Sequence, residues 1–135
     1  MVDVSGLKGE FTFLPQERVL FGQGALGRLA SEVDRVGGRR AFVITGTTIA
    51  TKTALLDQVQ QILGQNLVGT FYPISQHVPR GDVLSAALRA REANADVLIS
   101  LGGGSPVDGT KAVALCLSDG LVSGDQFDSY RPRSP

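Results

Sequence analysis

Short, continuously apolar runs alternate with longer amphipathic stretches along most of this chain. The runs are 41–45, 67–74 and 96–101, and the stretches that follow them carry apolar residues at helical spacing. A run that is apolar at nearly every position is typical of a parallel strand covered on both faces. The alternation therefore predicts an α/β fold, a Rossmann-like parallel sheet flanked by helices and joined by right-handed crossovers.

The other expected elements fill the gaps between these runs. Two short strands are expected at 11–14 and 18–21, as a hairpin around Pro15. Amphipathic spacing also predicts four helices. They are 24–36, 51–63, 81–93 and 105–117. Residues 119–135 are polar and rich in turn formers, so we expect a connecting loop or tail there.

Composition and charge exclude several classes of partner. The 135 residues include 13 Lys and Arg and 13 Asp and Glu, so the formal net charge is zero and no nucleic-acid partner is expected. There is no apolar run of about 18 residues, so we expect no membrane span. Cys116 is the only cysteine, which excludes an internal disulfide and fits a reducing, cytoplasmic location.

A glycine-rich loop carries the most specific chemical signal. Gly102, Gly103 and Gly104 directly follow an expected strand, and Ser105 and Pro106 open the next helix. Ligands bind at the carboxyl ends of strands in such sheets, and glycines let backbone N–H groups approach an anion. Ser105 is the expected N-cap and Pro106 the first helical residue. Because free N–H groups and the helix dipole favour negative charge, we expect a phosphate or pyrophosphate here.

Two charged residues follow this loop. Asp108 lies three residues after Ser105, so it could complete a capping box, contact the cofactor, or serve both roles in turn. Lys111 is expected to pair with Asp108 or to face solvent. Both interpretations of Asp108 stay open on the sequence alone.

A second glycine pattern, G-x-G-x-x-G, lies at 22–27. It matches the dinucleotide-binding fingerprint, which also needs an acidic residue about 20 positions later. The strand that should supply this acid ends in Thr45 and Gly46 instead. We therefore interpret 22–27 as a tight strand-to-helix turn rather than as the pyrophosphate site.

The residues after the 41–45 strand bear on cofactor choice. An aspartate there would accept a hydrogen bond from the ribose 2′-hydroxyl and repel a 2′-phosphate. Gly46 offers no such carboxylate, and the hydroxyls of Thr47 and Thr48 could donate to phosphate oxygens. This pattern indicates acceptance of NADP, with an ordinary polar turn as the alternative.

No catalytic residue and no metal site is expected within this chain. His77 is the only histidine, so there is no histidine pair to hold a metal or to activate a nucleophile, and we expect a surface or loop-packing role for it. Cys116 lies on the apolar face of the last expected helix and is interpreted as a core residue.

Three segments together resemble the N-terminal domain of the iron-containing (group III) alcohol dehydrogenases. They are 21–26, 41–45 and the long motif 95–112, which includes the glycine loop. Maleylacetate reductases and glycerol dehydrogenase-like enzymes belong to the same superfamily. The resemblance implies a Rossmann-like domain followed by an all-helical domain that this chain lacks, with the cofactor in the cleft between the two.

The resemblance also implies particular site residues. Gly103, Gly104 and Ser105 would bind the pyrophosphate, with Asp108 nearby. Gly46 falls where the family often carries the aspartate that sets NAD preference, so the cofactor is NADP or NAD. A divalent metal, iron or zinc, would be held by an aspartate and histidines of the helical domain, and is expected only in the complete enzyme.

These observations predict that 1–135 is a truncated nucleotide-binding domain of an NAD(P)-dependent alcohol dehydrogenase or carbonyl reductase. Its partners would be the dinucleotide and a small alcohol or carbonyl substrate, and an exposed apolar sheet face would favour a homo-oligomer. The chain alone should be inactive. Two alternatives are a non-catalytic dinucleotide-binding module and a sugar-phosphate cyclase of the dehydroquinate synthase type, which the glycine motif fits less well.

Overall fold

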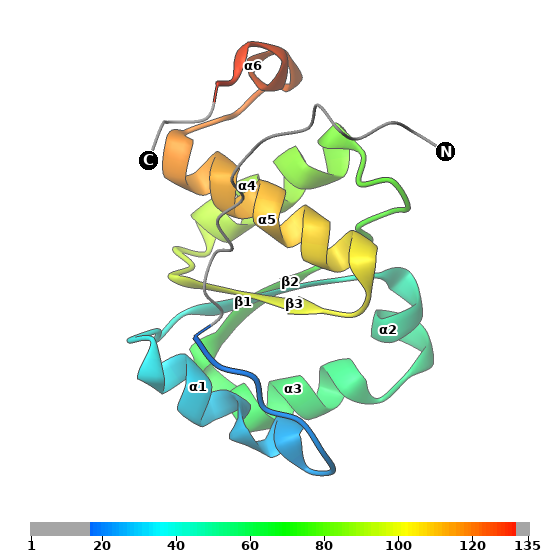
Figure 1. Cartoon of the computed structure of the whole chain (residues 1–135), viewed down its shortest axis with the longest axis vertical. Coiled ribbons are helices and arrows are strands. Elements are labelled where there is room, and N and C mark those ends of the chain that lie inside the picture. Colours follow the sequence, from blue (N-terminus) through cyan, green and yellow to red (C-terminus); the bar gives the residue numbers. More distant parts are fainter. Residues whose placement is uncertain (1–16, 132–135) are drawn as a thin grey trace, which may run out of the picture.

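The computed structural model describes residues 17–131, so the strand expected at 11–14 lies outside the described part. Within that part, three parallel strands form one sheet in the order β2-β1-β3. They are β1 (Ala41–Thr45), β2 (Leu67–Phe71) and β3 (Val97–Leu101). Helices cover both faces of the sheet (Figure 1). The predicted Rossmann-like α/β architecture is confirmed.

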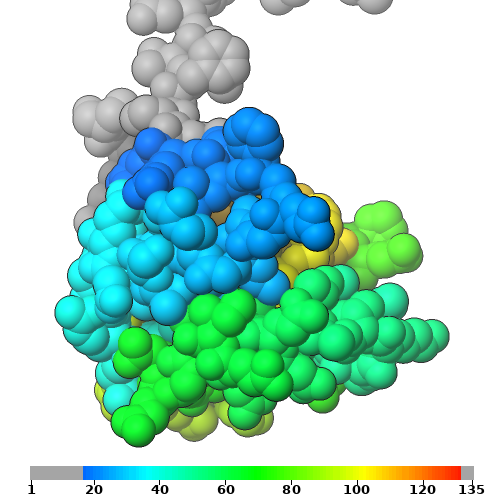
Figure 2. All heavy atoms as spheres, turned by 90° about the horizontal axis from the view of Figure 1, so that it is seen from below, coloured from blue at the N-terminus to red at the C-terminus, as the bar shows by residue number. Residues whose placement is uncertain are grey.

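Two pairs of helices make the two outer layers. On one face lie α1 (Leu29–Arg35) and α3 (Leu55–Leu63), and on the other lie α4 (Arg80–Glu92) and α5 (Gly104–Asp119) (Figure 1). Figure 2 views the first face, where atoms of α1 and the residues before it (blue) meet those of α3 (green). Each face therefore has its own apolar core between helices and sheet.

The central strand accounts for the continuous apolar run. All five residues of β1 are buried, because helices cover both faces and a strand pairs on each side. The residues of β2 and β3 are all only half-buried. Within residues 17–131, the large apolar side chains that are exposed all lie outside the three strands. Among the described residues, no helix is long and apolar enough to cross a membrane.

The expected strand at 18–21 is wrong, because these residues are described without strand pairing. Ion pairs attach this segment to α1 instead. Arg18 contacts Glu32 at 3.2 Å, and Glu17 contacts Arg35 at 2.7 Å. A short apolar run becomes a strand only where a partner strand satisfies its backbone groups. The helix expected at 24–36 begins as a 3₁₀ turn, η1 (Ala25–Arg28), before α1.

Two further boundaries differ from the sequence prediction. The helix expected at 51–63 is divided into α2 (Thr47–Lys52) and α3, because Thr53 is extended and its hydroxyl donates to the Ile49 carbonyl at 2.8 Å. The strand expected at 67–74 ends at Phe71, just before Pro73, which has no N–H for a ladder bond.

The tail expected at 119–135 contains a short helix, α6 (Gly124–Ser129). A capping box begins it, with the Ser123 backbone N–H donating to the Gln126 side-chain oxygen at 3.0 Å. Arg80 pairs with Asp128 at 2.6 Å and so connects α6 to the start of α4. This part of the tail is therefore an ordered element packed on the domain rather than a loop.

Candidate functional site

The two loops predicted to hold a ligand lie side by side. In the parallel pairing of β1 with β3, Thr45 stands opposite Leu101, so Gly46 and Gly102 leave the sheet at adjacent points of its carboxyl edge. A Cβ on Gly102 would lie 3.8 Å from Ile49, a residue of α2 in the neighbouring loop region. The structure thus brings the 46–48 turn next to the 102–105 loop.

The glycine loop presents its backbone to open space. Gly102 has φ +137°, a conformation that side-chain-bearing residues rarely adopt, and a Cβ there would also approach Pro106 to 3.0 Å. By contrast, a Cβ placed on Gly103 or Gly104 would meet nothing within 4 Å. The first glycine is needed for the turn itself. The next two leave an uncovered backbone that a ligand group could approach.

Helix α5 starts two residues earlier than it would with Ser105 as its N-cap. The N-cap is Gly103, whose carbonyl accepts from the Val107 N–H at 3.2 Å, and there is no side-chain cap bond. Ser105 therefore lies inside the first turn, and its expected capping role is wrong. The capping-box interpretation of Asp108 is wrong for the same reason, because the third residue of the helix that Gly103 caps is Pro106 rather than Asp108.

Asp108 and Lys111 form the pair that the sequence predicts. Their charged atoms are 3.8 Å apart, and their side chains are 69% and 76% exposed. An ion pair this exposed contributes less than about 1 kcal/mol to stability. The Asp108 carboxylate therefore stands at the surface of α5, within one turn of the glycine loop.

The turn after β1 is open in the same way. Gly46 is extended and is the N-cap of α2, whose first residues, Thr47 and Thr48, are exposed. A Cβ on Gly46 would meet nothing within 4 Å. A larger side chain could therefore be accommodated there without moving the backbone.

The second glycine pattern lies elsewhere. Gly22 and Gly24 both have positive φ, and the Ala25 N–H donates to the Gly22 carbonyl at 3.2 Å, which closes a tight turn leading into η1. This turn belongs to the α1 side of the molecule. Its interpretation as a turn is confirmed, although the segment before it is not the expected strand.

Cys116 and His77 are the other two residues considered from the sequence, and the structure describes both. Cys116 is fully buried in the core between α4, α5 and the sheet, as predicted, and burial raises the pKa of its thiol. His77 is exposed in the segment between β2 and α4. Within residues 17–131, no group of three or more His, Cys, Asp or Glu side chains could hold a metal ion.

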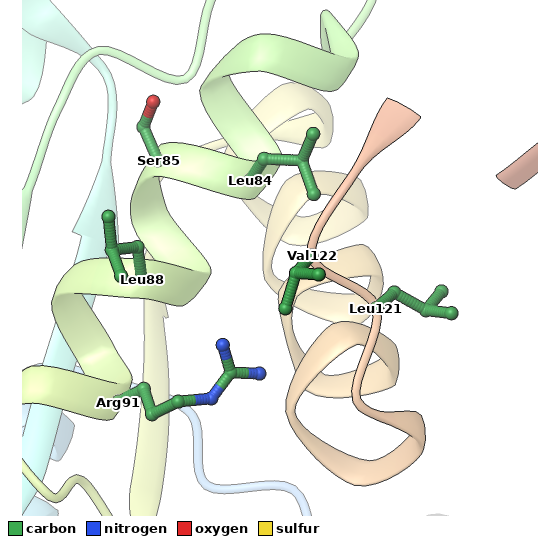
Figure 3. Close-up of a pocket in the computed structure, with 6 residues that line it drawn as sticks. All are labelled: Leu84, Ser85, Leu88, Arg91, Leu121 and Val122. Carbon is green, nitrogen blue, oxygen red and sulfur yellow. The ribbon is translucent and has the colours of Figure 1, made fainter. Parts of the chain in front are cut away.

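A cavity of about 210 Å³ lies between α4 and the chain that follows α5 (Figure 3). Its wall is apolar except for Ser85 and Arg91. The apolar lining residues are Leu84, Leu88, Leu121 and Val122. None of its lining residues belongs to the 46–48 turn or to the 102–105 loop.

The sequence prediction missed three residues that organise the site: Thr45, Ile74 and Gly109. Thr45 is the buried polar residue of the described core, and its hydroxyl donates to the Leu101 carbonyl at 2.6 Å. Gly109 lies inside a helix, where glycine costs stability and so indicates a packing constraint. That glycine was visible in the sequence, but its contact with Ile74 was not.

Comparison with known proteins identifies the chain's relatives. The sequence model of the family described as iron-containing alcohol dehydrogenase matches residues 15–133. The chain belongs to this family. Maleylacetate reductase 2 of Cupriavidus pinatubonensis is 40% identical over 98 residues, which are 73% of this chain and 26% of that protein. Alcohol dehydrogenase 4 of Saccharomyces cerevisiae is 33% identical over 107 residues, 78% of this chain and 28% of that protein.

Solved structures of family members agree with this assignment. NADH-dependent butanol dehydrogenase A of Thermotoga maritima superposes with a TM-score of 0.73 at 26% identity, over 88% of this chain and 30% of that one. Maleylacetate reductase of Rhizobium sp. strain MTP-10005 superposes with a TM-score of 0.70 at 32% identity, over 81% and 30%. The chain thus spans less than a third of the length of these iron-containing alcohol dehydrogenase relatives.

Proposed function

We propose that this chain holds NAD(P) at the carboxyl edge of its sheet, as the nucleotide-binding part of an oxidoreductase that interconverts an alcohol and a carbonyl compound. One observation carries the proposal: the two loops leave paired strands side by side, and the backbone of Gly103 and Gly104 faces open space. Family membership supports the reaction class, and the relatives' names, maleylacetate reductase and alcohol dehydrogenase, support the substrate class.

The glycine loop would hold the pyrophosphate. Gly103 and Gly104 leave room for it, and the N–H groups of Gly104 and Ser105 are the donors of the first turn of α5, since Pro106 has none. The positive end of the helix dipole adds to the attraction. Asp108 stands one turn further on and is a candidate contact for the rest of the cofactor.

The adenosine ribose would lie over the turn at Gly46. With no carboxylate there, a 2′-phosphate meets no repulsion, and the exposed hydroxyls of Thr47 and Thr48 are available as donors. The proposed cofactor is therefore NADP or NAD, with NADP accepted at least as well.

The chemistry divides between cofactor and protein. When bound, the nicotinamide ring donates or accepts the hydride. The residues of this chain bind the dinucleotide and fix its orientation. The family description implies iron, but the described residues offer no donor set that fits a metal. We assign the metal, iron or zinc, to the complete enzyme.

Replacement of Gly104 by valine tests the proposal. The branched side chain would fill the space over the loop and should weaken both NADH and NADPH by about 100-fold or more, measured by calorimetry. Gly124→Val is the matched control, because Gly124 is also the first residue of a helix and also has an open Cβ position. Dinucleotide binding that survives Gly104→Val would contradict the proposed site.

A further inference from the structure

A buried threonine connects the two loops of the proposed site. Thr45 is the last residue of β1 and is fully buried. Its hydroxyl donates to the carbonyl of Leu101, the residue directly before the glycine loop, at 2.6 Å. This side-chain bond adds to the β1–β3 ladder at the point where both loops leave the sheet. It holds the start of one loop against the start of the other.

A third segment is attached to the same threonine. The N–H of Ile74, which follows β2, donates to the Thr45 carbonyl at 3.1 Å. The Ile74 side chain is 4% exposed and packs under α5, where a Cβ on Gly109 would lie only 2.8 Å from its Cγ2. The segment after β2 can therefore approach the second turn of α5 only because Gly109 has no side chain.

These contacts form a closed ring around the glycine loop. It runs from Leu101 to Thr45 and Ile74, crosses to Gly109, and returns along α5 to Gly104. We propose that Thr45 and Gly109 are positioning residues, which fix the glycine loop and the start of α5 in the orientation that the dinucleotide needs. In this proposal the dinucleotide contacts neither residue. This inference rests on the proposed function, in which the glycine loop binds the pyrophosphate.

Two substitutions of Thr45 test the role of its hydroxyl group. Thr45→Val keeps the shape but removes the bond to Leu101, and we expect the Kd for NADPH to rise about five- to tenfold. Thr45→Ser keeps the hydroxyl and should restore affinity. Val59→Ala is the control, because Val59 is fully buried in the core between α3 and the sheet, makes none of the contacts of the ring, and its loss destabilises the fold. Its Kd should stay at the wild-type value.

The close approach at Gly109 allows a compensation test. Gly109→Ala should push α5 away from Ile74 and weaken dinucleotide binding. Ile74→Ala removes Cγ1, Cγ2 and Cδ1, the three atoms nearest the added methyl group, so the double variant should regain affinity relative to Gly109→Ala. Equal or weaker binding by the double variant would count against the inference.

A measurement without ligand separates the inference about Thr45 from the proposed function of the chain. Thr45→Val should speed hydrogen exchange at the amides of 102–105 in the 135-residue chain, while the amides of α3 keep their wild-type rates. If the wild-type chain binds neither NADH nor NADPH, the proposed function fails and the inference fails with it. If it binds one of them, and Thr45→Val changes neither the Kd nor the exchange at 102–105, the inference alone is overturned.

Discussion

At the scale of single residues, Gly46 makes the sharpest prediction about cofactor choice. Because no carboxylate stands there, the wild-type chain should bind NADPH at least as tightly as NADH. Gly46→Asp should reverse the order and weaken NADPH by about tenfold through repulsion of the 2′-phosphate. The open Cβ position allows the new side chain without a clash.

Calorimetric titration with both dinucleotides measures this preference. Gly27→Asp is the control, since it adds the same charge at an open position in η1, outside the proposed site. A wild-type chain that clearly preferred NADH would contradict the interpretation of Gly46.

Single residues also show which parts of the candidate site could be predicted from the sequence and which could not. The glycine loop was predictable, because a strand, three glycines and a helix start are local features. Ser105 was wrongly expected to be the N-cap, since the Gly103 carbonyl starts α5 and no local pattern distinguishes the two. The roles of Thr45 and Gly109 depend on Ile74, which is distant from both in sequence.

At the scale of elements, Asp96 joins the starts of two strands. Its carboxylate accepts from the backbone N–H of Arg40 at 2.8 Å and from that of Arg39 at 3.1 Å, just before β1, while Asp96 itself precedes β3. These hydrogen bonds, with that of Arg40 the stronger, lower the pKa of Asp96. The ionised form therefore stabilises the folded chain.

This linkage predicts a particular pH dependence. Because the folded pKa lies below the unfolded one, the contribution of Asp96 is complete above about pH 4 and is lost as the pH falls through the lowered folded value. Asp96→Asn should lower the urea midpoint at neutral pH and flatten its acid dependence. Asp57→Asn, at an exposed site on α3, is the control. An unchanged midpoint for Asp96→Asn would exclude the linkage.

Helices and strands were predicted well where a single hydrophobic periodicity dominates the segment. The apolar runs located all three described strands, and the helices corresponding to α4 and α5 were expected within one or two residues of their observed bounds. Errors arose where a side chain competes with the backbone, as at Thr53, or where a proline ends a strand, as at Pro73. The capping box of Ser123 and Gln126 was a local signal for α6 that the prediction missed.

At the scale of the whole molecule, the chain should bind cofactor without turning over substrate. It spans 26–30% of the relatives compared above, and its described residues include no metal-binding cluster. We expect the purified 135-residue chain not to oxidise alcohols with NAD or NADP. The absorbance of the reduced cofactor measures this activity. The butanol dehydrogenase of Thermotoga maritima, assayed with butanol and NAD, is the positive control. Measurable turnover by the chain alone would overturn this expectation.

The direct opposition of Thr45 and Leu101 also limits how such a domain can diversify. A single-residue insertion or deletion within β1 or β3 would displace one loop by about 3.3 Å and turn every later side chain of that strand to the opposite face. We therefore expect length changes inside these strands to disrupt the alignment of the two loops. Substitutions beyond the strand ends, at positions such as Gly46, should by contrast change cofactor choice without disturbing the register.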